Sequence, residues 1–231
     1  MQYLFTPPTV VSVPVIGKTE QFPVHRIYCV GRNYEEHAKE MGFTGREPPF
    51  FFLKPADALV FVPSGQTVDM PYPSLTKNLH HEIELVVAIG KGGKNISAAH
   101  ALEHIYGYAV GLDMTRRDLQ IKMREQGRPW EIGKAFDFGA PVGLLHPKAQ
   151  VGELGDAHIS LQVNGEVRQQ SNLSHLIWSI NETIANLSTL FELQPGDLIF
   201  SGTPEGVGPV KPGDHMLGQI AGLTPIDVAV V

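Results

Sequence analysis

The sequence is poor in cysteine, in net positive charge and in long apolar runs, and each shortage excludes a class of protein. Its 231 residues contain one cysteine, Cys29, so no internal disulfide can form. Acidic residues outnumber basic ones by 24 to 18, and the formal net charge of −6 gives no general attraction to nucleic acid or to an anionic membrane. No apolar segment reaches the roughly 18 residues that span a bilayer. We therefore expect neither a nucleic-acid-binding protein nor a membrane protein.

The beginning of the chain, MQYLFTPPTVVSVPV, lacks the charged segment before an apolar core that marks a signal peptide, and it contains three prolines. We expect neither a signal peptide nor a transit peptide. Cys29 has apolar neighbours in IYCV, and no feature near it would activate a thiolate. It is expected to be a buried structural thiol, not a nucleophile, in a reducing cytoplasm.

What is present fits a packed globular protein. Hydrophobic residues make up 42% of the chain and charged residues 18%, and 231 residues suffice for one substantial domain with a small N-terminal appendage. The 24 glycines and 18 prolines favour many short strands and turns. The expected strands are 9–15, 26–31, 81–89, 105–113, 159–163, 166–169, 197–201 and 226–231. Strands 159–163 and 166–169 form a hairpin, because Asn164-Gly165 suits a type I′ turn.

Helices are expected to be fewer. The predicted helices are 34–42, 97–104, 115–126 with Thr115 as its cap, and 176–190. The last of these places Ile177, Ile180, Ile184 and Leu187 on one face. Because strands outnumber helices and do not alternate with them, the pattern predicts a mixed, β-rich α+β fold and excludes a doubly wound sheet.

Three carboxylates stand out in two separate segments. Glu82 and Glu84 lie two apart on a predicted strand, so both side chains leave the same face; taken alone, this spacing equally suits a solvated face. Asp113 ends the next apolar strand, where functional side chains are often presented, although it could also cap the helix at Thr115. Three carboxylates on one site would suit Mg²⁺ or Mn²⁺ with open coordination positions, and not zinc. At most one of His80 and His81 can face that site.

Further polar residues could complete a catalytic site. In a helix over 34–42, His37 and Glu40 share a face, so the carboxylate could orient the imidazole as a base, although a solvated helix face fits the spacing as well. Lys134 stands among apolar residues in WEIGKAFDFG and must meet a carboxylate of the protein or of a ligand. The glycine-rich segment 200–214 lacks the ending of a phosphate-binding loop, but Thr203 within it could contact a substrate carboxylate.

Together these segments resemble the fumarylacetoacetate hydrolase family, in particular its single-domain acylpyruvase branch. The resemblance rests on stretches from residue 26 to the C-terminus. They are VGRNYEEHAKEMG, PFFFLKPADAL, YPSLTKNLHHEIELVVAIGKGGKNI, GYAVGLDMTRRDLQ, GRPWEIGKAFD, LQVNGEVRQ and GDLIFSGTPEGVGPVKPGD. The resemblance implies a catalytic domain over residues 26–231 with a mixed β-sandwich roll, and residues 1–25 as an N-terminal extension that could add a strand.

The resemblance also implies site residues and an assembly. It implies a homodimer with Mg²⁺ or Mn²⁺ bound by the residues at the positions of Glu82, Glu84 and Asp113. It implies a catalytic group and a set of substrate contacts. The catalytic group is His37, Glu40 and Lys134, and the substrate contacts are Arg32, Arg117, Gln120 and Thr203.

The activity implied is hydrolysis of the C3–C4 bond of 2,4-dioxo acids, that is, acylpyruvates such as fumarylpyruvate. Water activated by His37 would attack C4, and the metal would stabilise the pyruvate enolate that leaves. Two alternatives yield related enolates: decarboxylation of oxaloacetate, and isomerisation or decarboxylation of 2-hydroxyhepta-2,4-dienedioate in aromatic catabolism. Outside catalysis, the alternative is a metal-stabilised scaffold or small-molecule binding protein.

Overall fold

The computed structural model describes residues 2–34 and 46–231 and shows the β-rich fold with a few short helices that the sequence predicts. The largest sheet consists of β3 (Ile27–Gly31), β4 (Phe50–Lys54), β5 (Leu59–Phe61), β8 (Ile83–Ile89), β9 (Ile105–Leu112), β11 (Ala140–Val142), β12 (His146–Pro147) and β15 (Leu198–Phe200). Its order is β4-β3-β15-β8-β9-β11-β5, and β12 pairs with β9. The central pair β8 and β9 is antiparallel and carries the carboxylate segments.

Three smaller sheets complete the β structure. The five-stranded sheet has β6 (Thr67–Met70), β13 (His158–Val163), β14 (Glu166–Asn172), β17 (His215–Ile220) and β18 (Ile226–Val230). The three-stranded sheet has β7 (Leu79–His81), β10 (Thr115–Arg116) and β16 (Gly208–Val210), and the two-stranded sheet has β1 (Ser12–Pro14) and β2 (Gln21–Pro23). The helices among the described residues are α2 (Arg117–Glu125), α3 (Glu131–Lys134), α4 (Lys148–Val151) and α5 (Ile180–Leu190), with 3₁₀ turns η1 (Ala56–Ala58), η2 (Ala101–His104) and η3 (Leu173–His175).

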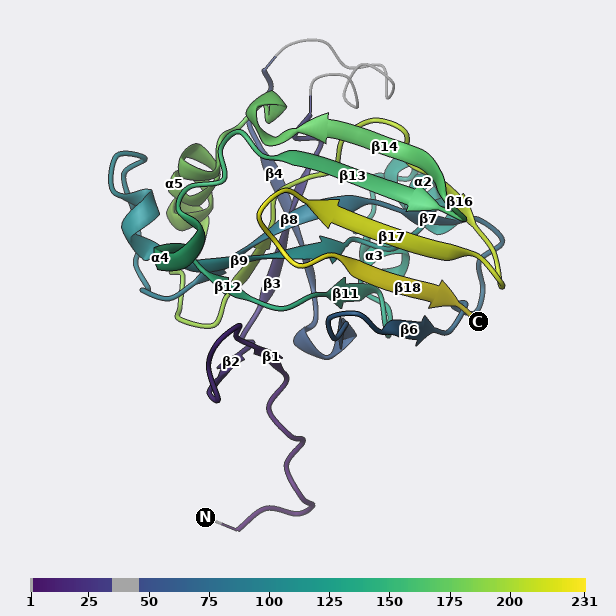
Figure 1. Cartoon of the computed structure of the whole chain (residues 1–231), viewed down its shortest axis with the longest axis horizontal. Coiled ribbons are helices and arrows are strands. Elements are labelled where there is room, and N and C mark those ends of the chain that lie inside the picture. Colours follow the sequence, from purple (N-terminus) through teal and green to yellow (C-terminus); the bar gives the residue numbers. More distant parts are fainter. Residues whose placement is uncertain (1, 35–45) are drawn as a thin grey trace.

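The large sheet is covered on both faces. The five-stranded sheet lies over one face, where Leu85 of β8 shares a hydrophobic cluster with Leu161 of β13 (Figure 1). On the other face, Val13 and Phe22 of the β1–β2 hairpin join the cluster that contains Val86. As a result every residue of β8 is buried, so the solvated-face alternative for Glu84 is wrong. Among the described residues, no helix is both long and apolar enough to cross a membrane.

The predicted strand 81–89 is interrupted at Glu82, which changes the position of this carboxylate in the site. β7 pairs with β10 and β16, whereas β8 pairs with β9 and β15, so the chain passes from one sheet to another between them. The Glu82 carbonyl accepts a hydrogen bond from the Asp113 N–H at 2.9 Å. Glu82 therefore stands at a crossing between two sheets, and not on a continuous strand face.

Other boundaries also differ from the prediction. Thr115 does not cap the predicted helix 115–126. It belongs to β10, where its backbone pairs with His80 of β7, and α2 starts only at Arg117. The predicted helix 176–190 starts at Ile180, because Ser179 and Glu182 form a capping box there. In place of the predicted helix 97–104, only the 3₁₀ turn η2 forms.

The remaining sequence predictions are met to different degrees. The predicted strand 9–15 shortens to β1, which pairs with the three-residue β2. The hairpin of β13 and β14 is confirmed, with φ of 53° at Asn164 and 81° at Gly165. Cys29 is confirmed as a buried free thiol, and burial raises its pKa well above the ordinary value. The predicted helix 34–42 lies almost entirely outside the described residues.

Candidate metal centre and substrate pocket

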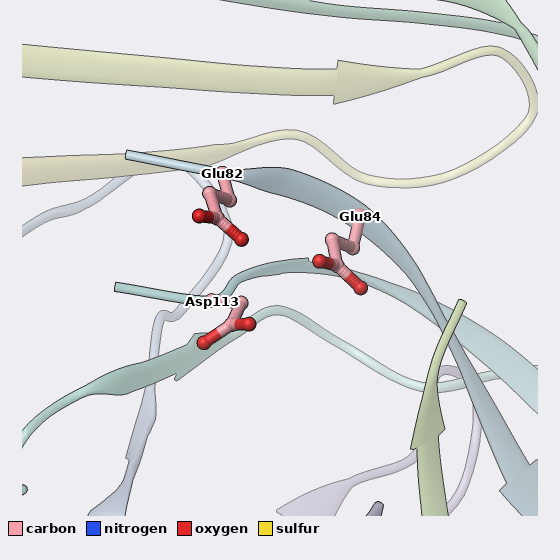
Figure 2. Close-up of side chains that lie close together, drawn as sticks. All are labelled: Glu82, Glu84 and Asp113. Atoms are coloured by element: carbon pink, nitrogen blue, oxygen red, sulfur yellow. The ribbon is translucent and has the colours of Figure 1, made fainter. Parts of the chain in front are cut away.

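Glu82, Glu84 and Asp113 come together where β8 begins and β9 ends (Figure 2). In the antiparallel register Glu84 faces Gly111 and Ile83 faces Leu112, which brings Asp113 beside the start of β8. One oxygen atom of each carboxylate lies within 4.8 Å of the others. The three residues are 6%, 1% and 1% exposed, respectively. The pairing of two strands that are distant in sequence thus brings three acidic side chains together where solvent has little access.

Two of these carboxylates are held by buried cations. The Lys134 ammonium lies 2.9 Å from Glu82 Oε2 and 2.6 Å from Asp113 Oδ2. Arg117 forms a further ion pair with Glu82, and the Lys54 ammonium lies 2.9 Å from Asp113 Oδ1. These contacts fix the positions of Glu82 and Asp113, since each cation would be costly to bury without its carboxylate.

Glu84 differs from the other two carboxylates. Within residues 2–34 and 46–231 it has no ion pair, and its Oε2 accepts a hydrogen bond of 2.7 Å from the Gly202 N–H. Burial raises the pKa of Glu84 well above its usual range, and the negative charges of Asp113 and Glu82 raise it further. The local field therefore disfavours a third negative charge and favours a cation beside it.

This donor set fits a hard divalent metal ion. The ligand atoms on offer are carboxylate oxygens, which Mg²⁺ and Mn²⁺ prefer, and the cluster contains no thiolate or imidazole that would favour zinc. A divalent cation between the three groups would relieve the repulsion that raises the pKa of Glu84. Neither neighbouring histidine joins the cluster, because His81 Nδ1 lies 2.9 Å from Gln169 Oε1 and His80 contacts Asn78 and Arg117.

A pocket opens directly over the cluster, and Glu82 and Glu84 are part of its lining. The other polar groups that line it are Arg32, Arg117, Gln120, Lys134 and Thr203, all of which the resemblance assigns to the site. Phe52 and Trp130 supply an aromatic wall, with ring centroids 5.8 Å apart. The pocket therefore combines a negative floor with cationic and hydrogen-bonding sides, an arrangement suited to a small anion bound together with a metal.

Local packing places two of these residues. Lys134 ends the short helix α3, and a side chain at Gly133 would meet the backbone of Gln120 at 2.8 Å, so the glycine allows α3 to approach α2 closely. Gln120 in turn accepts a hydrogen bond of 3.2 Å from Arg117. Burial lowers the pKa of Lys134, but the charges of Asp113 and Glu82 outweigh it and the net shift is upward. Lys134 remains a cation, as the sequence requires of a lysine in apolar surroundings.

Two residues of this region escaped the sequence reasoning. Lys54 of β4 has a fully buried side chain, and besides Asp113 it donates hydrogen bonds to the carbonyls of Met114 and Lys134. Gln169 of β14 connects His81 to Thr203. The signal for Lys54 was a single charge at the end of the apolar run FFFLK, whereas Gln169 gave none. His37 and Glu40 lie outside the described residues.

A β roll with a buried carboxylate cluster under a cationic pocket is the arrangement of a metal-dependent enzyme. Residues 26–231 match the fumarylacetoacetate hydrolase C-terminal family, and the chain belongs to that family. A fumarylpyruvate hydrolase of Ralstonia sp is 49% identical over 184 residues, which are 80% of this chain and 93% of that protein.

Two further relatives bear on the chemistry. The mitochondrial oxaloacetate tautomerase FAHD1 of Mus musculus is 43% identical over 197 residues, covering 85% of this chain and 87% of that protein. The crystal structure of fumarylpyruvate hydrolase from Pseudomonas aeruginosa in complex with Mn²⁺ and pyruvate is 61% identical. It superposes with a TM-score of 0.98 over 100% of this chain and 99% of that one.

Proposed function

We propose that the protein is a metal-dependent hydrolase that cleaves the C3–C4 bond of acylpyruvates, with fumarylpyruvate as the representative substrate. The observation that carries the proposal is the buried carboxylate cluster at the floor of a pocket lined by Lys134 and Arg117. Its support is the solved relative with a TM-score of 0.98, which holds Mn²⁺ and pyruvate, the product expected of this cleavage.

Glu82, Glu84 and Asp113 are the groups that would hold Mg²⁺ or Mn²⁺. When bound, the ion supplies Lewis-acid stabilisation of the negative charge that develops as the pyruvate enolate forms. The Gly202 N–H holds the carboxylate of Glu84. The ammonium of Lys134 holds the carboxylates of Glu82 and Asp113. Such preorganisation means that little rearrangement is needed when charge develops.

The cationic side of the pocket would bind the carboxylate end of the substrate. Lys134 and Arg117 supply positive charge next to Glu82, and Gln120 and Thr203 supply hydrogen bonds. In the reaction, a base takes a proton from water and the water oxygen adds to C4. The C3–C4 bond then breaks with its electron pair going to C3, and the C4 fragment leaves as a carboxylic acid. The resulting enolate takes up a proton at C3 to give pyruvate. We assign the activation of that water to His37 oriented by Glu40, a role that rests on the family resemblance.

The first test is a metal-dependence assay on a substrate panel. We expect turnover of fumarylpyruvate that is lost after treatment with EDTA and restored by Mn²⁺ or Mg²⁺, because within the described residues Glu84 has no ion-pair partner and a divalent ion would supply its counter-charge. Acetylpyruvate, oxaloacetate and 2-hydroxyhepta-2,4-dienedioate complete the panel. Turnover of fumarylpyruvate that survives chelation would remove the metal from the proposal, and metal-dependent melting without any turnover would favour a binding protein.

The second candidate function is chemistry on oxaloacetate, favoured by the 43% identity to the mouse oxaloacetate tautomerase. Interconverting the keto and enol forms of oxaloacetate moves a proton between C3 and the 2-oxo oxygen and requires no attacking water. Decarboxylation of oxaloacetate, and isomerisation of the seven-carbon dienedioate, likewise proceed through an enolate. The same panel separates these reactions, since the tautomer change is followed by ultraviolet absorbance and only cleavage or decarboxylation releases pyruvate.

Arg32 is expected to distinguish acyl groups by their charge. It lines the pocket, adopts a left-handed φ of 54° and stacks 5.0 Å from the ring centre of Phe50. We assign it to the distal carboxylate of a fumaryl group. Arg32→Leu should raise the KM for fumarylpyruvate about 10-fold or more, as expected for loss of a hydrogen bond to a charged group, and leave that for acetylpyruvate nearly unchanged.

Steady-state kinetics on both substrates checks this assignment. Arg128→Leu is the matched control, because Arg128 is exposed and does not line the pocket. Equal losses on the two substrates in Arg32→Leu would contradict the assignment and leave Arg32 as a general support of the pocket.

The assembly and the cellular setting complete the proposal. We infer a homodimer from the family resemblance, to be checked by analytical ultracentrifugation of the full chain. A cytoplasmic location is supported by the buried free thiol of Cys29. A fumarylpyruvate-cleaving activity would place the protein in the degradation of aromatic compounds.

A further inference from the structure

Gln169 of β14 has a buried side-chain amide that contacts Thr203, one of the residues that line the pocket. It is 1% exposed. Its Oε1 accepts a hydrogen bond of 3.1 Å from the Ile83 N–H and lies 2.9 Å from His81 Nδ1. Its Nε2 donates hydrogen bonds of 2.8 Å to Thr203 Oγ1 and of 2.8 Å to the Pro204 carbonyl. One side chain thus joins the start of β8 to the loop that carries Thr203.

The orientation of this amide is fixed by two backbone groups. The Ile83 N–H can only donate, so it requires the oxygen of the Gln169 amide, and the Pro204 carbonyl can only accept, so it requires the nitrogen. A flipped amide would oppose like groups at both places. The nitrogen of Gln169 must therefore face Thr203.

This orientation determines the direction of the Thr203 hydroxyl. Its oxygen accepts from Gln169 Nε2, which leaves its single proton to be donated elsewhere. Among the residues that the structure describes, no protein acceptor takes that proton. Thr203 lines the pocket together with Glu84 and Lys134, so an acceptor on a bound molecule would meet the hydroxyl there.

The loop itself is held at consecutive residues. The Gly202 N–H donates to Glu84 Oε2 at 2.7 Å, while Gln169 binds Thr203 and Pro204. Gly202 has a φ of 99°, and a side chain there would meet Asn33 at 2.6 Å, so the backbone has little freedom to shift. These contacts of Gly202 do not depend on Gln169, so they still hold the loop when a change at Gln169 removes the donor that directs the Thr203 proton.

We propose that Gln169 is a positioning residue that fixes the Thr203 hydroxyl as a hydrogen-bond donor to an oxygen of the anionic 2-oxo acid. The proposal rests on the function proposed above and adds a specific role to a residue outside the pocket. It predicts that Gln169 contributes to ligand binding only through Thr203.

The test is a double-mutant cycle on binding of oxalate or pyruvate to the Mn²⁺-loaded protein, measured by calorimetry. Gln169→Glu keeps the shape but replaces the donor with an acceptor, so the Thr203 proton turns toward the introduced carboxylate. We expect Gln169→Glu and Thr203→Val each to weaken binding about 10-fold or more, as for loss of a hydrogen bond to a charged group. In the Thr203→Val background, Gln169→Glu should cause no further loss, and Thr203→Ser should bind as the unaltered protein does.

The controls separate this role from general damage. Gln170→Glu makes the same chemical change at the exposed neighbour of Gln169 and should leave binding unchanged. If Gln169→Glu does not fold, Gln169→Met repeats the cycle without a buried charge. Additive losses in the cycle would overturn the role of Gln169 alone. Failure of the unaltered protein to bind either probe would overturn the proposed function and this role with it.

Discussion

Replacing Glu84 with glutamine should abolish metal-dependent turnover while the protein stays folded. Glutamine keeps an oxygen for the Gly202 N–H but removes the negative charge that a divalent ion needs. Outer partners of metal ligands alone are worth about 10- to 100-fold, so loss of a ligand should cost more than about 100-fold in kcat/KM.

When no metal is added, the same substitution should leave the stability of the fold unchanged or raise it, although it abolishes turnover. Burial and the charges of Asp113 and Glu82 raise the pKa of Glu84, which means that its ionised form is disfavoured in the folded protein. Glu84→Gln should therefore melt at the same or a higher temperature in EDTA, and the stabilisation by added Mn²⁺ should disappear.

Glu125→Gln is the matched control, since Glu125 is exposed at the end of α2. It should retain both turnover and the Mn²⁺-dependent rise in melting temperature. Undiminished metal-dependent turnover in Glu84→Gln would show that Glu84 is not a ligand.

Removal of Lys54 is expected to produce the largest loss of stability. Its ammonium lies 2.9 Å from Asp113 Oδ1 and 3.0 Å from the Met114 carbonyl, and its side chain is 0% exposed. Lys54→Met would leave a buried carboxylate short of one counter-ion and two carbonyls without their donor. Breaking a buried pair in this way costs about 3–5 kcal/mol of unfolding free energy.

Urea denaturation in EDTA measures this effect. Lys54→Met combined with Asp113→Asn should recover part of the loss, because the uncompensated charge is then gone, and the two changes should be clearly non-additive. Lys77→Met, at an exposed lysine, should stay within about 0.5 kcal/mol. If Lys54→Met also changed the free energy of unfolding by no more than about 0.5 kcal/mol, the buried ion pair would contribute little to stability.

Features with a local cause were predictable from the sequence. The hairpin of β13 and β14 follows from the Asn164-Gly165 turn and the alternation around it, and both are confirmed. The buried face of α5 follows from the spacing of Ile184 and Leu187, both fully buried. The start of that helix was placed too early, since the capping box of Ser179 and Glu182 was not recognised.

The environment of the site could be predicted only in part. The alternation of Glu82 and Glu84 indicated a shared face, and the end of a strand indicated Asp113, but nothing local showed that β7 and β8 belong to different sheets. The run FFFLK has no alternation, so β4 was not predicted, and the single charge at its end did not show that Lys54 would be buried. The burial of Gln169 depends on Pro204 and its neighbours, which are far away along the chain.

The sequence by itself determined the turn, the helix face, the acidic residue types and the absence of a disulfide, because each follows from side-chain chemistry or from spacing over a few residues. The tertiary structure decided which polar groups lose contact with water and which partners they meet. Lys54 reaches Asp113, and Gln169 reaches Thr203, only when distant strands pair. Such partnerships depend on strand register between segments, and register is a property of the packed core.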